Sequence, residues 1–165
     1  MKAPNITSNA RHDEVRAAVA ANYPKIAHDL LRPLLDLLSI AREACGGDVD
    51  KFLIMLVVAV RTTEHKAFAT YTQEELLSGE LPVFPGLGTN VRSIAESARV
   101  PRETIRRKVG ELVEAGWIDR QGHELRFTSL AYQQLAIVRV GIEQLAARDF
   151  EVVRSLLLRS DVNAL

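Results

Sequence analysis

Basic side chains crowd into one short stretch of this 165-residue chain, and their type and spacing point to one kind of chemistry. Between Asn90 and Lys108 the cations are Arg92, Arg99, Arg102, Arg106, Arg107 and Lys108. Only Glu96 and Glu103 oppose these six, so the stretch carries a net charge of +4. Clustered cations neutralise phosphates and release counterions, and arginine can bond guanine O6 and N7 together. The stretch therefore has the chemistry of a surface for duplex DNA.

A helix should present these cations on one face. The apolar residues at i, i+4, i+7 and i+8 are Ile105, Val109, Leu112 and Val113, which predicts a helix that buries one stripe. With that stripe inward, the outward face carries Glu103, Arg107, Gly110 and Glu114, flanked by Thr104 and Arg106, with Arg102 at the exposed N-terminal end. Thirteen helical residues span roughly 20 Å, which is long enough to lie along a groove of DNA.

Each exposed side chain on this helix has an expected role. Helices that enter a major groove contact bases mainly with their N-terminal residues, so Arg102, Thr104 and Arg106 are the expected base contacts. We expect Arg107 and Lys108 to hold phosphates. Glu103 could accept a hydrogen bond from a cytosine amino group, or pair with Arg107 at i+4. The full predicted set of DNA contacts also includes Thr89, Asn90, Arg120 and His123.

Short elements on either side of this helix complete a recognisable order. Ile94, Ala95 and Ala98 predict a short preceding helix, and Val100-Pro101 interrupts its period because a residue before proline is pushed out of the α region. Ala115-Gly116 should end the second helix. Two β-type runs, Trp117-Ile118 and Leu125-Arg126-Phe127, flank Arg120-Gln121-Gly122-His123 and predict a hairpin. A helix, a tight turn, a second helix and a small hairpin form a shape that offers its second helix to DNA.

The segment SIAESARVPRETIRRKVGELVEAGWIDR resembles the winged helix-turn-helix of bacterial transcription regulators, including the GntR, IclR, Crp and MarR groups. The positions that carry the resemblance are Ala95, Ala98, Val100, Thr104, Arg107, Leu112, Gly116 and Ile118. The resemblance covers about a quarter of the chain, and it implies that Arg102, Thr104, Arg106 and Arg107 belong to the recognition helix. The fold expected from it is mainly α with a small β-hairpin wing, flanked by N- and C-terminal helices.

Two positions depart from the family pattern. Arg99 stands where glycine is common, which carries a conformational cost if its φ is positive. Pro101 replaces the usual capping Ser or Thr, so a side-chain cap is lost while the ring presets the start of the helix. The wing is also shorter than in MarR-type regulators and lacks their acidic-arginine tip.

The rest of the chain predicts helices around this motif. We expect a flexible lead-in over residues 1–10, a helical region over 11–78, a loop over 79–88, the winged helix over 89–128, and C-terminal helices over 129–165. Before the motif, helices are expected from Asp13 to Asn22, from Lys25 to Gly46 with a kink or start at Pro33, and over 51–71 after a cap at Asp48 or Asp50. A brief helix should follow from the Thr72–Glu75 capping box to Leu77. After the motif, helices are expected from Thr128 to Ala147 and from a cap at Asp149 onward. Phe52 to Val60 is apolar on every side, which predicts burial all round. Aliphatic stripes before and after the motif are too rich for a monomer surface, so a homodimer is expected.

Composition narrows the classes of function. The formal net charge is zero, so affinity for DNA must come from the local basic excess. Cys45 is the single cysteine, and neither a signal peptide nor a membrane-length apolar run is present, which favours a cytoplasmic protein. A buried structural role is expected for Cys45. The histidines His12, His28, His65 and His123 lack metal-ligand spacing, and no phosphate loop or nucleophile elbow occurs, so we expect neither an enzyme nor a cofactor.

Two alternatives to a DNA-binding regulator are open from the sequence. The winged helix could be an adaptor whose basic surface meets an acidic protein, because a fold does not imply a function. A small-molecule effector could also bind in a pocket among the N-terminal helices near Phe52, Met55, Phe68 and Tyr71. Apolar residues at helical spacing more often form plain core.

Overall fold

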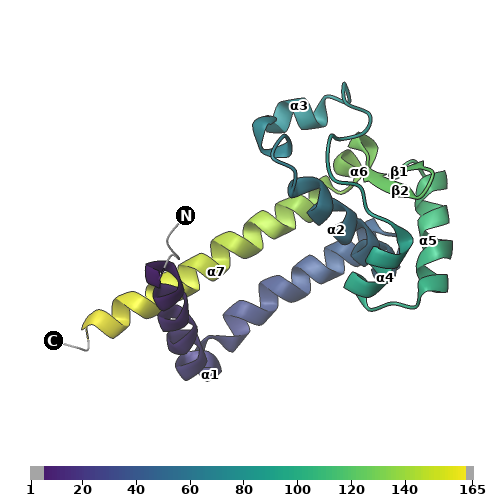
Figure 1. The fold of residues 1–165 in the computed structure, drawn as a ribbon. Coiled ribbons are helices and arrows are strands. Elements are labelled where there is room, and N and C mark those ends of the chain that lie inside the picture. Colours follow the sequence, from purple (N-terminus) through teal and green to yellow (C-terminus); the bar gives the residue numbers. More distant parts are fainter. Residues whose placement is uncertain (1–5, 163–165) are drawn as a thin grey trace. The chain divides into compact units, whose positions relative to one another are not determined.

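The computed structural model describes residues 6–162, which are mainly helical with one small antiparallel hairpin, as the sequence predicts (Figure 1). The elements are α1 (Ile6–Ala44), α2 (Val49–Thr63), a 3₁₀ turn η1 (Phe68–Thr70), α3 (Gln73–Leu77), α4 (Val91–Ala98), α5 (Arg102–Glu114), β1 (Ile118–Gln121), β2 (Glu124–Phe127), α6 (Ser129–Gln134) and α7 (Ala136–Val162). Ser39–Arg139 forms one compact unit, here the central unit. The described residues up to Leu38 and from Val140 onward form the other, here the terminal unit.

Helix α1 is continuous where the sequence predicts a lead-in and two helices. Residues 1–5 lie outside the described residues, but the chain is helical from Ile6 onward, so the predicted lead-in is wrong for residues 6–10. Pro24 and Pro33 both lie inside the helix. Each proline removes one hydrogen bond and crowds the preceding turn, which bends a helix without necessarily ending it. Figure 1 shows a sharp bend in α1.

Helix α2 begins as predicted but ends early. The Asp48 side chain caps it by accepting hydrogen bonds from the backbone amides of Asp50 and Lys51. The helix ends at Thr63, eight residues before the predicted end at residue 71. Thr62 and Thr63 donate their hydroxyls to the carbonyls of Val58 and Val60, which competes with helix continuation.

Burial of α2 is also less complete than predicted. Ile54, Met55 and Val58 are buried, but Leu56 and Val60 are 39% and 49% exposed. The prediction of burial on every side is therefore wrong, and one face of α2 is open.

The core of the central unit joins segments that the sequence alone assigns to separate regions. It contains buried residues of α2, α3, α4, α5, the hairpin and α6: Ile54, Met55, Val58, Leu76, Ile94, Ile105, Val109, Leu112, Ile118, Leu125, Phe127 and Ala131, together with Phe84 from the predicted loop. Three of the four residues in the predicted inward stripe of α5 are buried, and Val113 packs against the core while partly exposed. Apolar burial against this core fixes which face of α5 remains outward.

The connection between α4 and α5 is a tight turn. The Asn90 side chain caps α4 by accepting from the amide of Ser93. Arg99 ends the helix in the left-handed region with φ 55° and ψ 39°, which is the costly case anticipated from the sequence. Pro101 precedes α5 without any side-chain cap, also as expected. At the other end Gly116 has φ +75°, and Trp117 donates its amide to Leu112 in a Schellman arrangement.

The hairpin is tighter than the sequence suggests. Ile118 pairs with Phe127 and Gln121 with Glu124, so the turn contains only Gly122 and His123. Gly122 has φ +63° at the first turn position, a conformation that favours glycine in two-residue hairpins. Arg120 therefore lies in strand β1 and not in the predicted four-residue turn.

The backbone segment before α4 pairs with β2 at Thr89 and Phe84. Thr89 exchanges two backbone hydrogen bonds with Leu125, at 3.0 and 2.8 Å. Phe84 donates its amide to Phe127, and its ring is only 1% exposed. The predicted loop over 79–88 is thereby tied to the hairpin at its middle and directly after its end.

The C-terminal helices break at a different place from the one predicted. Thr128 caps α6 through the amide of Ala131, and α6 ends at Leu135. Helix α7 then runs without interruption through Asp149, which the sequence predicts as a cap between two helices. An aspartate within a helix costs only a fraction of a kcal/mol, roughly 0.7 at most, so continuous apolar contacts outweigh it.

The terminal unit contains parts of α1 and α7, and much of its apolar surface is uncovered. Leu37 is buried, and a Cβ at Gly141 would lie 2.9 Å from its side chain, so these two helices approach closely there. The exposed aliphatic and aromatic residues of this unit include Leu31, Leu34, Leu35, Leu38, Val140, Ile142, Phe150 and Leu158. Among the described residues, no helix has the length and apolar character required to cross a membrane.

Candidate nucleic-acid interface

An open groove on the central unit gathers arginines from three separate elements. Its lining consists of Asn90, Val91 and Arg92 from the start of α4, Arg102 and Arg106 from the start of α5, and Arg120, Gly122 and His123 from the hairpin. The groove has a volume of about 620 Å³. Its lining includes four arginines and one histidine but neither an aspartate nor a glutamate, so its lining carries positive charge with no opposing carboxylate.

Local structure explains why these side chains converge. Arg102 and Arg106 are one turn apart on α5, and the adjacent buried residues Ile105 and Val109 hold that helix against the core. Arg120 and His123 reach the same groove because the two-residue turn places them at the tip of a short hairpin. The first turn of each helix and the turn of the hairpin therefore face one space.

Arg92 is a groove residue that the predicted set of DNA contacts omits. It belongs to the first turn of α4, and its side chain is 76% exposed. The signal in the sequence was its position two residues after the capping Asn90, which places it at the same helix end. Asn90 itself lines the groove, as predicted, although its side-chain oxygen is engaged as the cap of α4.

Glutamates pair with these arginines from outside the groove. Arg106 lies 3.2 Å from Glu103, and Arg92 lies 2.8 Å from Glu96. The sequence suggested a Glu103–Arg107 pair, but Arg107 pairs with Glu111 instead, at 2.5 Å. The side chains of Arg92, Arg106 and Arg107 are 76%, 57% and 64% exposed, and ion pairs this open to water are weak. A phosphate or a base can therefore compete for these guanidinium groups.

Two predicted contacts point elsewhere in the structure. Lys108 is buried because its angular position on α5 turns it toward the first turn of α2, where it pairs with Asp48 and Asp50. Thr89 is 6% exposed, and its backbone pairs with Leu125 beside β2. We therefore remove Lys108 and Thr89 from the set of DNA contacts.

The other predicted contacts lie on the outer face of α5. Glu103 and Arg107 are exposed, and Thr104 is partly buried. None of the three lines the groove. They occupy the flank of α5 next to it, where a long ligand that follows the helix would reach them.

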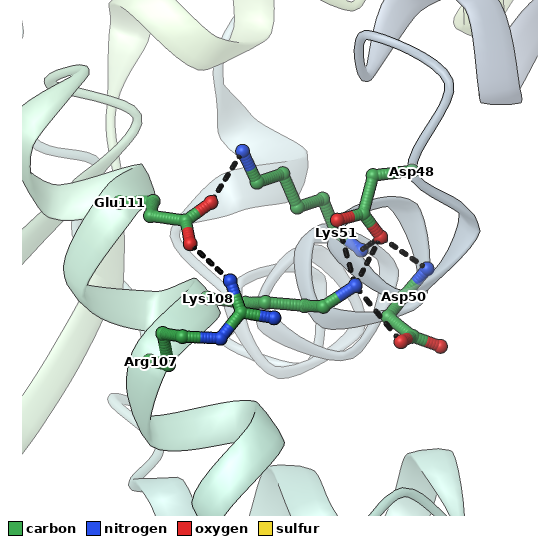
Figure 2. A network of polar contacts seen from close by, with 6 residues as sticks. All are labelled: Asp48, Asp50, Lys51, Arg107, Lys108 and Glu111. Carbon is green, nitrogen blue, oxygen red and sulfur yellow. Dashed lines mark hydrogen bonds and ion pairs between the residues drawn. The ribbon is translucent and has the colours of Figure 1, made fainter.

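Beneath the exposed arginines, a network of charges connects α5 to the first turn of α2 (Figure 2). Partial burial opposes ionisation of Asp48, but hydrogen bonds from Lys108 and from the amides of Lys51 and Asp50 outweigh it, so the pKa of Asp48 lies below its ordinary value. Partial burial likewise disfavours the charged form of Lys108, but bonds to Asp48 and Asp50 raise its pKa. Asp48 and Lys108 therefore both favour their charged forms, which strengthens the ion pair between α2 and α5.

The residues expected around an effector pocket are core residues. Met55 belongs to the buried core, Phe68 and Tyr71 pack against it, and Phe52 is 8% exposed. None of them lines the groove at α5. Phe68 contacts Phe84 edge to face, with ring centroids 5.9 Å apart, which is ordinary aromatic packing.

Cys45 has the buried structural position expected from the sequence. It is 6% exposed, and burial together with the nearby Asp48 carboxylate raises the pKa of its thiol to about 11. Such a thiol is almost entirely protonated at neutral pH and therefore a poor nucleophile.

Comparisons with known proteins do not assign this site: no protein-family model, no curated protein and no solved structure matches the chain. The geometry of the groove and its charge must therefore support any functional conclusion.

Proposed function

We propose that this protein is a winged-helix regulator that binds duplex DNA, with α5 as the helix that enters the major groove. The observation that supports this most strongly is the convergence of Arg92, Arg102, Arg106 and Arg120 on one open groove without a lining carboxylate. Four guanidinium groups on one surface provide the phosphate neutralisation that dominates affinity for DNA. The protein would act as a binding protein in the cytoplasm, and not as an enzyme.

The shape of the basic surface favours a duplex over other anions. A helix with its side chains is about 10–12 Å wide, and the major groove of B-DNA is about 12 Å wide. The first turn of α5 is exposed at Arg102, Glu103 and Arg106, so it is free to enter such a groove. The hairpin tip with Arg120 and His123 would then contact the flanking backbone. The lining of the protein groove contains no Phe, Tyr or Trp, and His123 is its single ring, so it offers no row of aromatic rings for successive single-stranded bases.

Fluorescence anisotropy with labelled duplexes tests the proposal. Wild-type affinity should fall steeply with salt, because binding releases counterions. Arg102→Ala and Arg106→Ala should each weaken binding by about 1–3 kcal/mol where a base contact is lost. Arg61→Ala is the matched control, since Arg61 belongs to α2 in the same unit, removes the same charge and does not line the groove.

Two outcomes would count against DNA as the ligand. If Arg102→Ala and Arg106→Ala bind as tightly as the Arg61→Ala control, α5 is not the contacting helix. If the wild type binds no duplex but captures an acidic protein through the same arginines, the adaptor hypothesis is correct.

We also propose that the protein acts as a homodimer through the apolar face of its terminal unit. Exposed leucines of α1 recur at i, i+3, i+4 and i+7, at Leu31, Leu34, Leu35 and Leu38. This is the spacing of one helix face, and apolar side chains left this open favour contact with an equally apolar surface. A second copy supplies such a surface, and two-fold symmetry would present two α5 helices to a palindromic site.

Analytical ultracentrifugation tests the dimer. Leu35 is 58% exposed, so Leu35→Glu should preserve the fold while shifting the protein to monomers. Leu77→Glu is the control, because Leu77 is an exposed leucine of the central unit, at 37%. A wild type that sediments as a monomer at all concentrations would refute the dimer and leave the DNA proposal untouched.

A further inference from the structure

The ammonium of Lys108 is held by three carboxylate oxygens. Its Nζ lies 2.5 and 2.6 Å from the two side-chain oxygens of Asp48, and 2.9 Å from an oxygen of Asp50. An ammonium has three protons to donate, so these contacts saturate it. The Lys108 side chain is 9% exposed, and Figure 2 shows it pointing into the first turn of α2.

The partner carboxylate is itself fixed. Asp48 accepts hydrogen bonds from the amides of Asp50 and Lys51, at 3.0 and 3.2 Å, as the cap of α2. Those amides belong to the backbone of α2 and cannot move independently of the helix. Lys108 is therefore anchored to a point that is rigid with respect to α2, which in turn contributes Ile54, Met55 and Val58 to the core.

A second bridge joins the same two helices. Lys51 Nζ lies 2.7 Å from Glu111, and Glu111 also pairs with Arg107 at 2.5 Å. Lys108 and Glu111 are three residues apart, so the bridges contact α5 on successive turns. Two separate points of attachment restrict both rotation of α5 about its axis and sliding along it.

Apolar packing alone restricts these motions less. The buried stripe of Ile105, Val109 and Leu112 is held by contacts that have little directionality. A rotation of about 20° moves an atom about 6 Å from a helix axis by about 2 Å. Productive binding geometry requires placement within about 0.5 Å. The ionic contacts oppose such a rotation because their bonds are short and directed. Their contribution to stability is a separate matter, since replacing a buried ion pair by apolar groups is often neutral for the free energy of unfolding.

We propose that Lys108, with Asp48 and Asp50, is a positioning device that sets the rotation of α5 and thereby the DNA sequence that its arginines select. This inference rests on the proposed DNA-binding function. Lys108 itself does not touch DNA. Its contribution is to discrimination between sequences, and removal of the whole cluster should leave the fold and the non-specific attraction to phosphates intact.

The test compares a single and a triple variant. Lys108→Met leaves two unpaired carboxylates and should lower the denaturant midpoint. The triple variant Asp48→Ser, Asp50→Asn and Lys108→Met removes all three charges and keeps a hydroxyl cap for α2, so its midpoint should recover toward the wild type. The affinity ratio between a duplex selected by the wild type from a random library and a scrambled duplex should fall tenfold or more in the triple variant. The triple variant is one unit more positive than the wild type, so its affinity for the scrambled duplex should be equal or slightly higher, with a similarly steep salt dependence.

A folded triple variant with a wild-type affinity ratio overturns the proposal. If the triple variant does not fold, Asp50→Asn removes one carboxylate contact of Lys108, keeps the Asp48 cap of α2 and should lower the ratio two- to threefold; an unchanged ratio again overturns the proposal.

A measurement on the protein without DNA distinguishes a failure of this inference from a failure of the proposed function. Residual dipolar couplings of backbone amides report the orientation of α5 relative to α2. In the triple variant we expect a changed or averaged orientation, and an orientation identical to the wild type refutes the positioning role. A wild type that prefers no duplex refutes the proposed function instead, whatever the couplings show.

Discussion

Replacement by alanine should change the free energy of unfolding in opposite directions at two glycines, one inside α5 and one directly after it. Gly110 lies inside α5, and a Cβ added there would meet no atom within 4 Å. Alanine is better than glycine in a helix interior by about 0.5–1 kcal/mol, because the unfolded chain loses less entropy. Gly110→Ala should therefore raise the free energy of unfolding by about that amount.

Gly116 lies just after α5 in a backbone conformation that penalises any side chain. Its φ is +75°, and a Cβ would lie 3.2 Å from the Leu130 side chain. The left-handed conformation costs an L-residue about 1–2 kcal/mol, of which reduced freedom of the unfolded chain returns about 0.4–1 kcal/mol. Gly116→Ala should therefore lower the free energy of unfolding, by roughly 1 kcal/mol.

The two variants can be compared by urea unfolding. Trp117 is the single tryptophan and is partly buried beside Gly116, so its fluorescence reports the central unit. The denaturant midpoints should move in opposite directions with an unchanged dependence on urea concentration. Destabilisation by Gly110→Ala would mean that another group covers that face of α5, and it would refute the argument that the arginine-bearing face is open.

Three further predictions follow from the same structure. Arg99→Gly should raise the free energy of unfolding by about 0.5–1 kcal/mol in the same assay, because glycine adopts a φ of 55° without the steric cost; a loss of stability would show that the Arg99 side chain makes a compensating contact. Because the pKa of Asp48 is lowered on folding, its contribution to stability should be complete above its ordinary pKa and lost as pH falls below about 4. Urea midpoints measured against pH should therefore fall in acid for the wild type, and they should fall less for Asp48→Asn. Cys45, whose pKa is raised to about 11, should react with a thiol reagent at pH 8 far more slowly than in urea-unfolded protein; equal rates would place the thiol at the surface.

Much of the local structure could be predicted because it depends on residues close together in the chain. The capping box formed by Thr72 and Glu75, the cap at Asp48 and the end of α5 at Gly116 all involve groups within about five positions of one another. The buried stripe of α5 follows from apolar periodicity, which depends only on the helical repeat. The left-handed conformation of Arg99 was signalled only by the family resemblance, which places this residue where glycine is common.

The predictions that failed are those in which local signals compete with packing. Pro24 in α1 and Asp149 in α7 suggest breaks between helices, yet both helices continue through them. A local penalty of a few kcal/mol at most is outweighed when a long helix retains its contacts on either side.

The sequence by itself determined that a basic helix with one apolar face follows a tight turn and precedes a short hairpin, since side-chain periodicity and backbone preferences are properties of neighbouring residues. Only the tertiary structure decided that Lys108 is buried and which arginines share one groove. Lys108 meets a carboxylate sixty positions earlier in the chain, while Arg92 and Arg120 meet Arg102 across an open groove. Contacts between residues so far apart depend on how helices pack around the core, and no local pattern encodes that arrangement.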